Sequence, residues 1–352
     1  MKRKNRKIIA ILIFLIVIAA CGYFFVYKPF FRNKEEGRVR KAAPSADSAA
    51  GTKSKAATAN AQAKGDSLQV SSRNNQKKND EAAGLLKQAK TLQASGKQSE
   101  AQRTFEDIIN KYPDTWARRQ ANFELGKIYL AQNDKYASRK AFSDALPGLD
   151  GQMRAEAISA LNKLNEFLIF SPADSKDGII YIVQSGDSLI KIARKYSTSA
   201  GFIKRINNLK TDALHIGQRL KIVSGTWEIF VYKSKFLLDV YLNGQFVKEY
   251  PVSTGMYDKT PEGEFVISVK QVNPTWYSPE GVIPYGDPRN LLGTRWLGFK
   301  EKGDITGYGI HGTIDESSIG KEASNGCIRM HNRDAEELYD MVPEGTKVFI
   351  KD

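Results

Sequence analysis

Near its N-terminus the chain carries twenty consecutive residues without a charge, and few structures can accommodate such a segment. The run extends from Ile8 to Tyr27 and follows a tip in which five of the first seven residues are Lys or Arg. Twenty apolar residues in a helix span about 30 Å, the thickness of the hydrocarbon core of a bilayer. Because the basic residues precede the run, we expect residues 1–27 to form an anchor with a cytoplasmic tip and everything after it to lie outside.

The same segment can also be interpreted as an export signal. Residues 18–21, Ile-Ala-Ala-Cys, resemble the processing site of a bacterial lipoprotein, in which Cys21 would carry the lipid. The apolar run continues past Cys21 to Val26, whereas a processed lipoprotein usually turns polar there. An uncleaved anchor is therefore the preferred interpretation. Both predict a protein of a bacterial cell membrane, single-pass in the preferred case, whose remaining domains are extracytoplasmic.

The net charge of +14 is concentrated in the N-terminal part of the chain. Residues 1–80 contain 17 Lys or Arg and 5 Asp or Glu, whereas residues 227–352 contain 14 and 19. A nucleic-acid-binding domain needs its basic residues on one face of a folded unit. The pattern argues against a nucleic-acid partner and favours attraction of the N-terminal segment to acidic lipid headgroups or anionic wall polymers.

Composition and periodicity divide the following part of the chain into two stretches. Residues 28–80 are rich in Ala, Ser, Lys, Asn and Gln and poor in large apolar side chains, so we expect a disordered linker. Residues 81–170 show a helical period, and Leu92–Phe105 recurs in outline 37 residues later as Tyr129–Phe142. This recurrence resembles tetratricopeptide repeats, whose paired helices can form a groove for a protein partner. A helical spacer without a partner is the alternative.

Residues 179–224 have the pattern of a strand, two helices and a second strand. The first strand and helix fall within Tyr181–Ala193, and the last turn and strand within Leu214–Ile222. The pattern closely resembles the LysM domain, a small βααβ fold whose family binds N-acetylglucosamine-containing glycans. The resemblance implies contact with wall glycan through the loops after Gly186 and near Asn207. A LysM fold that does not bind glycan is the alternative.

Strand patterns dominate residues 227–352. Asn243 and Gly244 lie between two strand-like runs, which is a strong signal for a β-hairpin. Only residues 333–342 indicate a helix, and Asn332 is suited to cap its N-terminus. We therefore expect a mostly-β sandwich or barrel with one short helix as the C-terminal domain of a multidomain chain.

The two cysteines of the chain lie far apart in sequence. Cys21 falls in the apolar run, which leaves Cys327 without a plausible intrachain partner, so its thiol is either a buried structural group or a reactive one. Cys327 follows Gly326, and His311-Gly312 lies sixteen residues upstream. A neighbouring imidazole can make a thiol the attacking nucleophile in acyl transfer and typically lowers its pKa. The pattern predicts Cys327 as nucleophile and His311 as base.

Three motifs together resemble the L,D-transpeptidase (YkuD-like) catalytic domain over residues 227–352: Thr260–Phe265, Tyr308–Thr313 and Ser324–Met330. In that family the Cys attacks the amide after the L-centre of diaminopimelate in a peptidoglycan stem and releases D-Ala. The side-chain amine of a second stem then resolves the thioester. The resemblance implies that peptidoglycan stem peptides and glycan strands are the partners, and that no metal or cofactor takes part.

The resemblance also assigns roles to individual residues. Cys327 is the implied nucleophile and His311 the general base. Neighbouring residues receive supporting roles: Gly312 orients the imidazole through its carbonyl, Ser324 and Gly326 shape the oxyanion site, and Arg329 holds a substrate carboxylate. The sequence departs from the family at Asn325, where many members have His, which leaves any second imidazole in doubt.

Several alternatives stay open on the sequence alone. An inert Cys327 would make the C-terminal domain a non-catalytic wall-binding scaffold. His331 could replace His311 as base, and Arg329 could pair with an acid on the sheet instead of binding substrate. A zinc site built from the same Cys and two His would lack a fourth ligand. An L,D-carboxypeptidase, in which water resolves the thioester, and a sortase-like transpeptidase are the alternative enzymes.

Overall fold

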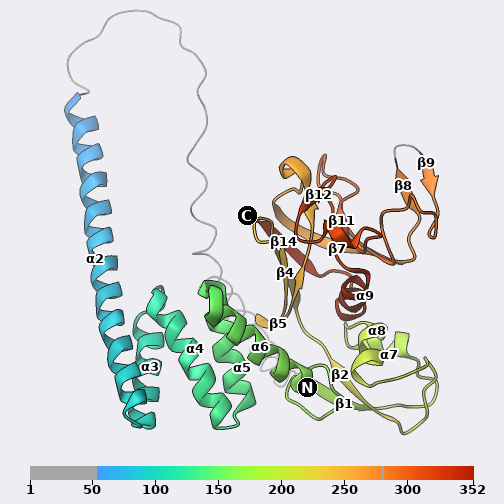
Figure 1. Ribbon diagram of the computed structural model, residues 1–352, viewed down its shortest axis with the longest axis horizontal. Coiled ribbons are helices and arrows are strands. Elements are labelled where there is room, and N and C mark those ends of the chain that lie inside the picture. The colour runs from blue at the N-terminus through green and yellow to red at the C-terminus, as the bar shows by residue number, and fades with distance from the viewer. Residues whose placement is uncertain (1–53, 279–280) are drawn as a thin grey trace, which may run out of the picture. The chain divides into compact units, whose positions relative to one another are not determined.

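The computed structural model describes residues 54–278 and 281–352. Figure 1 shows the course of the chain, in which five helices precede a small two-stranded module and a strand-rich C-terminal domain. The predicted anchor of residues 1–27, with its possible lipidation site Cys21, lies outside the described residues. Among the helices that are described, none combines the length and the apolar character needed to cross a bilayer.

Helix α2 (Ser54–Ala94) corrects the prediction that the whole of residues 28–80 is a disordered linker, because residues 54–80 are helical. This segment is rich in Ala, Lys and Gln, which are among the strongest helix formers. A shortage of large apolar residues predicts that a segment cannot build a core of its own. It does not prevent the segment from forming a helix, because helix formation does not require a core.

The helical character of residues 81–170 is confirmed. After α2 come α3 (Gln98–Lys111), α4 (Trp116–Ala131), α5 (Lys135–Ala145), the short η2 (Leu146–Gly148) and α6 (Gly151–Leu168). The hydroxyl of Thr115 caps α4, and the carboxylate of Asp134 caps α5. A Cβ on Gly126 would lie 2.7 Å from the Phe142 ring, so the glycine allows α4 and α5 to pack closely.

The predicted βααβ order of the next module is confirmed. It consists of β1 (Gly178–Ile182), α7 (Leu189–Lys195), α8 (Ala200–Ile206) and β2 (Arg219–Val223), with the two strands antiparallel. Ser188 accepts a hydrogen bond from the N–H of Lys191 at the start of α7, and Ser199 does the same for Phe202 in α8. These caps fix where each helix begins.

The C-terminal domain is mostly β, as expected, and is built on a single sheet within the described residues. Eight strands follow the order β13-β11-β10-β7-β14-β3-β4-β5, and the pairs β6–β12 and β8–β9 form separate ribbons. The strands are β3 (Trp227–Tyr232), β4 (Leu237–Leu242), β5 (Gln245–Pro251), β6 (Thr254–Gly255), β7 (Gly263–Val272), β8 (Trp276–Ser278), β9 (Gly281–Ile283), β10 (Arg295–Phe299), β11 (Gly309–His311), β12 (Glu322–Ser324), β13 (Ile328–Arg329) and β14 (Lys347–Lys351).

The large sheet has two edges, β13 and β5, and so departs from the closed barrel or stacked sandwich that the strand pattern suggested. Alternating apolar residues predict that one face of a sheet is covered, but they do not say by what. Here helices supply the cover, since α9 (Asn332–Met341) packs against β10 and β11, and α5 and α6 pack against β5.

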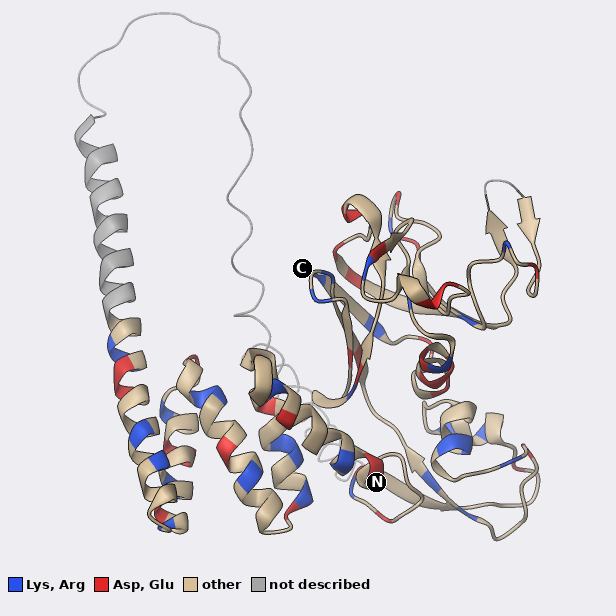
Figure 2. Cartoon of the chain, in the orientation of Figure 1, with Lys and Arg blue, Asp and Glu red and all other residues tan. Residues whose placement is uncertain are grey.

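Two local predictions in this domain had different outcomes. Asn243 (φ 51°) and Gly244 (φ 73°) form the tight turn between β4 and β5, with the two positive φ angles that such a hairpin requires. The capping role expected for Asn332 is wrong, because Asn332 is the first residue of α9 and the preceding His331 makes no side-chain cap. Figure 2 shows Lys and Arg interspersed with Asp and Glu along the described part of this domain.

Candidate active site

The pairing of β11 with β13 brings the predicted nucleophile and base to one face of the sheet. The strands are parallel, with Ile310 beside Ile328 and His311 beside Arg329. Both isoleucines are fully buried and face the core, so their neighbours face the other side. Cys327 directly precedes β13 and shares the face of Arg329. In an ideal parallel pair, with a rise of about 3.3 Å per residue and about 4.8 Å between strands, this register would place the Cα atoms of Cys327 and His311 about 8 Å apart.

The thiol of Cys327 is half-buried at the edge of this face. Its Sγ lies 3.7 Å from the carbonyl oxygen of Gly307, to which it donates. The proposed chemistry requires the thiol to turn from this carbonyl toward the imidazole. Catalytic hydrogen bonds of this kind often tighten only when substrate binds.

The buried imidazole of His311 is held in one tautomer. Its Nδ1 lies 2.6 Å from the carbonyl oxygen of Gly312, and because a carbonyl only accepts, Nδ1 carries the hydrogen. Nε2 therefore keeps its lone pair and can accept a proton. The indole of Trp296 on the adjacent β10 lies against the ring, with centroids 5.7 Å apart. The hydrogen bond between Nδ1 and the Gly312 carbonyl is the contact that the orienting role implied for Gly312 requires.

Burial keeps both reacting groups neutral at pH 7. It lowers the pKa of His311 to about 4, with the Gly312 carbonyl opposing the shift. It raises the pKa of the Cys327 thiol, although the Gly309 backbone and the charge of Arg329 act in the opposite direction. The expected lowering of the thiol pKa is therefore wrong for this structure, because desolvation of the thiolate outweighs its stabilisation. Proton transfer from sulfur to nitrogen must accompany attack on a substrate.

The turn that carries the nucleophile is held by two hydroxyl groups. Ser324 Oγ donates to the Cys327 carbonyl (2.6 Å) and accepts from the Gly326 N–H (3.0 Å). Thr260 Oγ1 donates to the Gly326 carbonyl (3.0 Å) and accepts from the Gly255 N–H (2.7 Å). Because the Gly326 N–H is bound to Ser324, the N–H of Cys327 is the better candidate for an oxyanion donor. The supporting role of Thr260 was not recognised in the sequence.

Gly326 is required by both conformation and space. Its φ of +128° is one that side-chain-bearing residues rarely adopt, and a Cβ there would lie 2.5 Å from the Tyr308 ring. The same Cβ would lie 3.0 Å from the carbonyl oxygen of Lys259. The glycine therefore sets the path by which the chain reaches Cys327.

Arg329 lies on the same face as the thiol and is half-buried. Within the described part of the chain its Nε is buried without a hydrogen-bond partner. Burial lowers its pKa, while the charges of Asp315 and Cys327 raise it. A guanidinium with an unused donor beside the nucleophile is suited to a carboxylate ligand, as the implied role requires.

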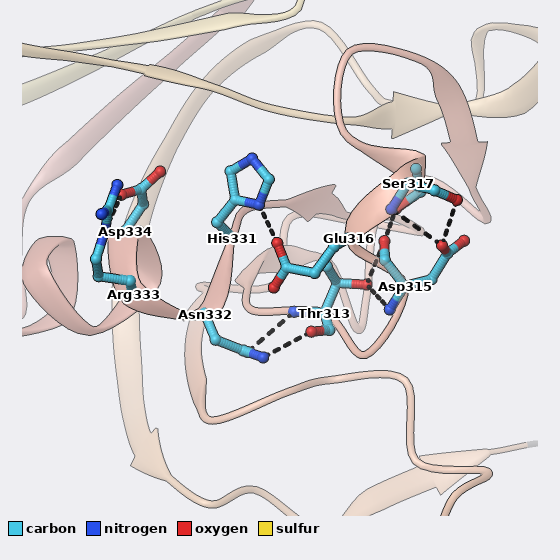
Figure 3. A network of polar contacts seen from close by, with 9 residues as sticks. Thr313, Asp315, Glu316, Ser317, His331, Asn332, Arg333 and Asp334 are labelled. Carbon is cyan, nitrogen blue, oxygen red and sulfur yellow. Dashed lines mark hydrogen bonds and ion pairs between the residues drawn. The ribbon is translucent and has the colours of Figure 1, made fainter.

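The other candidates lie elsewhere. The ring of His331, the alternative base, pairs through Nδ1 with the carboxylate of Glu316, as Figure 3 shows. Asn325, which replaces the family's second imidazole, is exposed, and so is His215 in the βααβ module. Sequence reasoning also missed the role of Asn332, whose amide contacts Thr313 (Figure 3) and whose only signal was its position just after the Cys motif.

A half-buried thiol, a neutral imidazole and a guanidinium on one face of a β sheet are the groups that a cysteine-dependent acyltransferase needs. Models of three protein families match separate parts of the chain. The L,D-transpeptidase catalytic domain matches residues 226–350, the LysM domain residues 181–223, and the tetratricopeptide repeat residues 83–115. The chain belongs to the L,D-transpeptidase family. The LysM and tetratricopeptide resemblances are confirmed with it.

Two relatives that are similar in sequence support the same assignment. The chain is 48% identical to YqjB of Bacillus subtilis, a protein named as an L,D-transpeptidase. The 126 aligned residues cover 35% of this chain and 70% of that protein. It is 36% identical to YkuD of Bacillus licheniformis, which is also named as an L,D-transpeptidase. The 181 aligned residues cover 49% of this chain and 98% of that protein. A solved L,D-transpeptidase from Mycobacterium smegmatis is 21% identical, with a TM-score of 0.31 and coverage of 39% and 65%.

Proposed function

We propose that the protein cross-links peptidoglycan stem peptides through a thioester on Cys327 while its LysM domain binds wall glycan. The observation that carries this proposal is the placement of Cys327 and His311 on one face of β11 and β13, with the Gly312 carbonyl holding the imidazole in the tautomer of a base. Membership of the L,D-transpeptidase family supplies the substrate class and the reaction.

In the first half of the reaction the sulfur replaces an amine on the donor stem. His311 Nε2 accepts the proton of the Cys327 thiol as Sγ forms a bond to the amide carbon after the L-centre of diaminopimelate. The carbonyl oxygen becomes an oxyanion that the N–H of Cys327 is placed to stabilise. When the C–N bond breaks, the imidazolium returns its proton to the leaving nitrogen. D-Ala departs, and the acyl group remains on sulfur as a thioester.

In the second half an amine on another stem replaces the sulfur. The side-chain amine of the acceptor attacks the thioester carbon and transfers a proton to His311 Nε2. The C–S bond then breaks, and the proton returns to the thiolate of Cys327. Two stems are thereby joined by a new amide, and the enzyme is restored. Water attacking the same thioester gives the L,D-carboxypeptidase outcome, and the balance depends on which nucleophile reaches the carbon.

The LysM domain offers a groove for the glycan. A cavity of about 630 Å³ is lined by the start of α7, by α8 and the residues that follow it, and by Asp340 of α9. It includes the segment after the predicted Gly186 loop (Ser188–Ile190) and the segment after Asn207 (Asn208–Lys210). These segments adjoin or form the loops to which the LysM resemblance assigns glycan contact, which supports wall glycan as the ligand.

We also propose that the chain is held at the bacterial membrane by its apolar segment, residues 8–27, with the catalytic domain on the wall side. The five basic residues of the tip support this orientation. Cell fractionation with external protease tests it: the catalytic domain should pellet with membranes and be cleaved in protoplasts. The helical repeats, in turn, are proposed as a site for a protein partner, which crosslinking in cells would reveal.

Incubating the purified full-length protein with a disaccharide tetrapeptide tests the function directly. We expect release of D-Ala and formation of a cross-linked dimer, both abolished in Cys327→Ala. Cys21→Ala, which removes the other thiol of the chain, is the control and should keep full activity. Release of D-Ala by Cys327→Ala would rule out the mechanism, and D-Ala release without dimers would identify a carboxypeptidase.

A further inference from the structure

The side chain of Asn332 joins two segments that lie well before it in the sequence. Its Oδ1 accepts hydrogen bonds from the N–H groups of Thr294 (3.1 Å) and Thr313 (3.2 Å), which precede it by 38 and 19 residues. Its Nδ2 donates to the carbonyl oxygen of Thr313 (2.7 Å). Figure 3 shows this carboxamide facing Thr313 from the start of α9. All three bonds go to backbone groups, so Asn332 fixes the course of the chain.

One of these bonds acts on the peptide unit that orients the catalytic imidazole. The Thr313 N–H belongs to the same planar peptide as the Gly312 carbonyl, and the two point in opposite directions because the peptide is trans. Asn332 holds the N–H of this plane, while His311 Nδ1 binds its carbonyl at 2.6 Å. Rotation of the plane would break both bonds together. The amide of Asn332 is therefore coupled to the imidazole through one rigid group.

Two glycines leave open the space that the Asn332 side chain occupies. A Cβ on Gly293 or on Gly312 would lie 2.2 Å from Asn332 Oδ1, so both positions must be glycine for the amide to enter. The Gly312 N–H is held separately by the carbonyl of Arg295 at 3.1 Å. The peptide before the plane is thus anchored to β10, and the plane itself is anchored by α9.

We propose that Asn332 is a positioning residue for the transpeptidation, which holds the Gly312–Thr313 peptide plane so that His311 keeps Nδ1 engaged and presents Nε2 to Cys327. Asn332 does not touch the reacting atoms. It acts through the Gly312 carbonyl, and the inference rests on the proposed function for its kinetic consequence. Its structural consequence, the tautomer of His311, does not depend on the reaction.

Steady-state release of D-Ala by the full-length protein gives the kinetic test. Asn332→Ala should lower kcat at least tenfold, about the cost of misplacing a catalytic group by a fraction of an ångström to 1 Å, and should change KM little. Asn332→Asp keeps an acceptor for both N–H groups and loses only the donor to Thr313. Its kcat should fall less and should recover toward wild type as the pH is lowered and the introduced carboxyl gains a proton.

Asn165 provides a matched control. It is a buried asparagine whose Nδ2 donates to the backbone carbonyls of Phe246 (3.0 Å) and Val247 (2.9 Å), far in sequence from the His311 segment. Asn165→Ala removes a comparable pair of hydrogen bonds to the backbone of the same sheet. It should lower the thermal stability while kcat stays within about twofold of wild type, since no catalytic group is displaced. A kcat loss in Asn165→Ala equal to that in Asn332→Ala would reduce Asn332 to a structural role.

A spectroscopic measurement separates this proposal from the proposed function. The chain has three histidines, so ¹⁵N-histidine labelling with His215 and His331 variants for assignment gives the tautomer of His311 directly. Wild type should show Nδ1 protonated and Nε2 without a proton, and Asn332→Ala should show a mixture of the two tautomers. An unchanged tautomer together with an unchanged kcat in Asn332→Ala would overturn the proposal. If wild type releases no D-Ala but the tautomer of His311 still differs between wild type and Asn332→Ala, only the proposed function is overturned.

Discussion

Burial keeps the imidazole of His311 unprotonated, and it thereby sets the pH range in which His311 can act as a base. In water an imidazole is protonated below about pH 6.5 and loses its lone pair. Desolvation lowers the pKa of His311 to about 4, so Nε2 stays unprotonated well into the acid range. The raised pKa of the Cys327 thiol means that ionisation of the free thiol adds nothing near neutrality.

The rate of acylation should therefore be flat from about pH 5 to 8 and fall below the pKa of His311, near 4. Acylation of Cys327 by a carbapenem, followed by intact mass at a series of pH values, measures this limb without the acceptor step. An acid limb centred between about pH 6 and 7 would mean that the imidazole is solvated or paired in the working enzyme.

Arg329 should act on substrate binding more than on the chemical step. Its buried Nε has no partner among the described residues, and a charged hydrogen bond to a carboxylate is worth about 1.5–3 kcal/mol. Arg329→Ala should raise KM for a tetrapeptide donor by roughly ten- to hundredfold, and Arg329→Lys by less. A donor with its terminal carboxyl amidated is the control. If the same KM increase appears with that donor, Arg329 does not bind the carboxylate.

At the scale of elements, the turn between β12 and β13 decides where the thiol lies. Gly326→Ala should cost about 1–3 kcal/mol of stability and reduce acylation at least tenfold, because the new Cβ meets the Tyr308 ring and the φ of +128° is strained. Gly320→Ala is the matched control, since Gly320 also has positive φ (+82°) but an open Cβ position. Its stability should fall by about 1 kcal/mol without loss of acylation. Equal rates in both variants would contradict the assigned role of the turn.

Some elements could be predicted from the sequence because their causes are local. The Asn243-Gly244 turn follows from the positive φ angles that these residues tolerate. Asn332 looked suited to a helix cap. It contacts Thr294 and Thr313 instead, and no local rule brings those segments to the start of α9.

The chemistry of the candidate site was only partly readable for the same reason. Cys327, His311 and Gly312 stand out because each occurs in a motif, and the register of β11 and β13 places them as the motif requires. The direction of the thiol pKa was predicted wrongly, because the pattern reveals the neighbouring imidazole but not the desolvation that the sheet imposes. Thr260 lies 66 residues from the turn it holds, a contact that sequence spacing does not indicate.

At the scale of the whole molecule, the LysM groove should matter for the wall and not for the chemical step. Ile190 lines the groove and is 59% exposed, whereas Ile216 of the same domain is 75% exposed and lies outside the groove lining. Ile190→Asp should weaken binding to purified sacculi at least tenfold, since a charge replaces apolar contact with the sugar face. Activity on a soluble disaccharide tetrapeptide should not change.

Ile216→Asp is the control for this prediction and should bind sacculi like wild type. Equal loss of binding in both variants would place the glycan site elsewhere on the module. A loss of soluble activity in Ile190→Asp would instead show that the groove contributes to the catalytic domain.

The arrangement of domains along the chain followed from changes in periodicity, whereas the open sheet and the helix of residues 54–80 depend on packing and helix propensity that apolar patterns do not report.

Intact-mass spectrometry of the full-length protein mixed with a disaccharide tetrapeptide in the absence of an acceptor tests the central claim most directly. We expect an adduct equal to the donor minus D-Ala, located by peptide mapping on Cys327 and removed by hydroxylamine as a thioester is. His311→Ala should slow the appearance of this adduct by at least about a hundredfold at pH 7. An adduct on any other residue, or one that forms equally fast without the imidazole, would contradict the account.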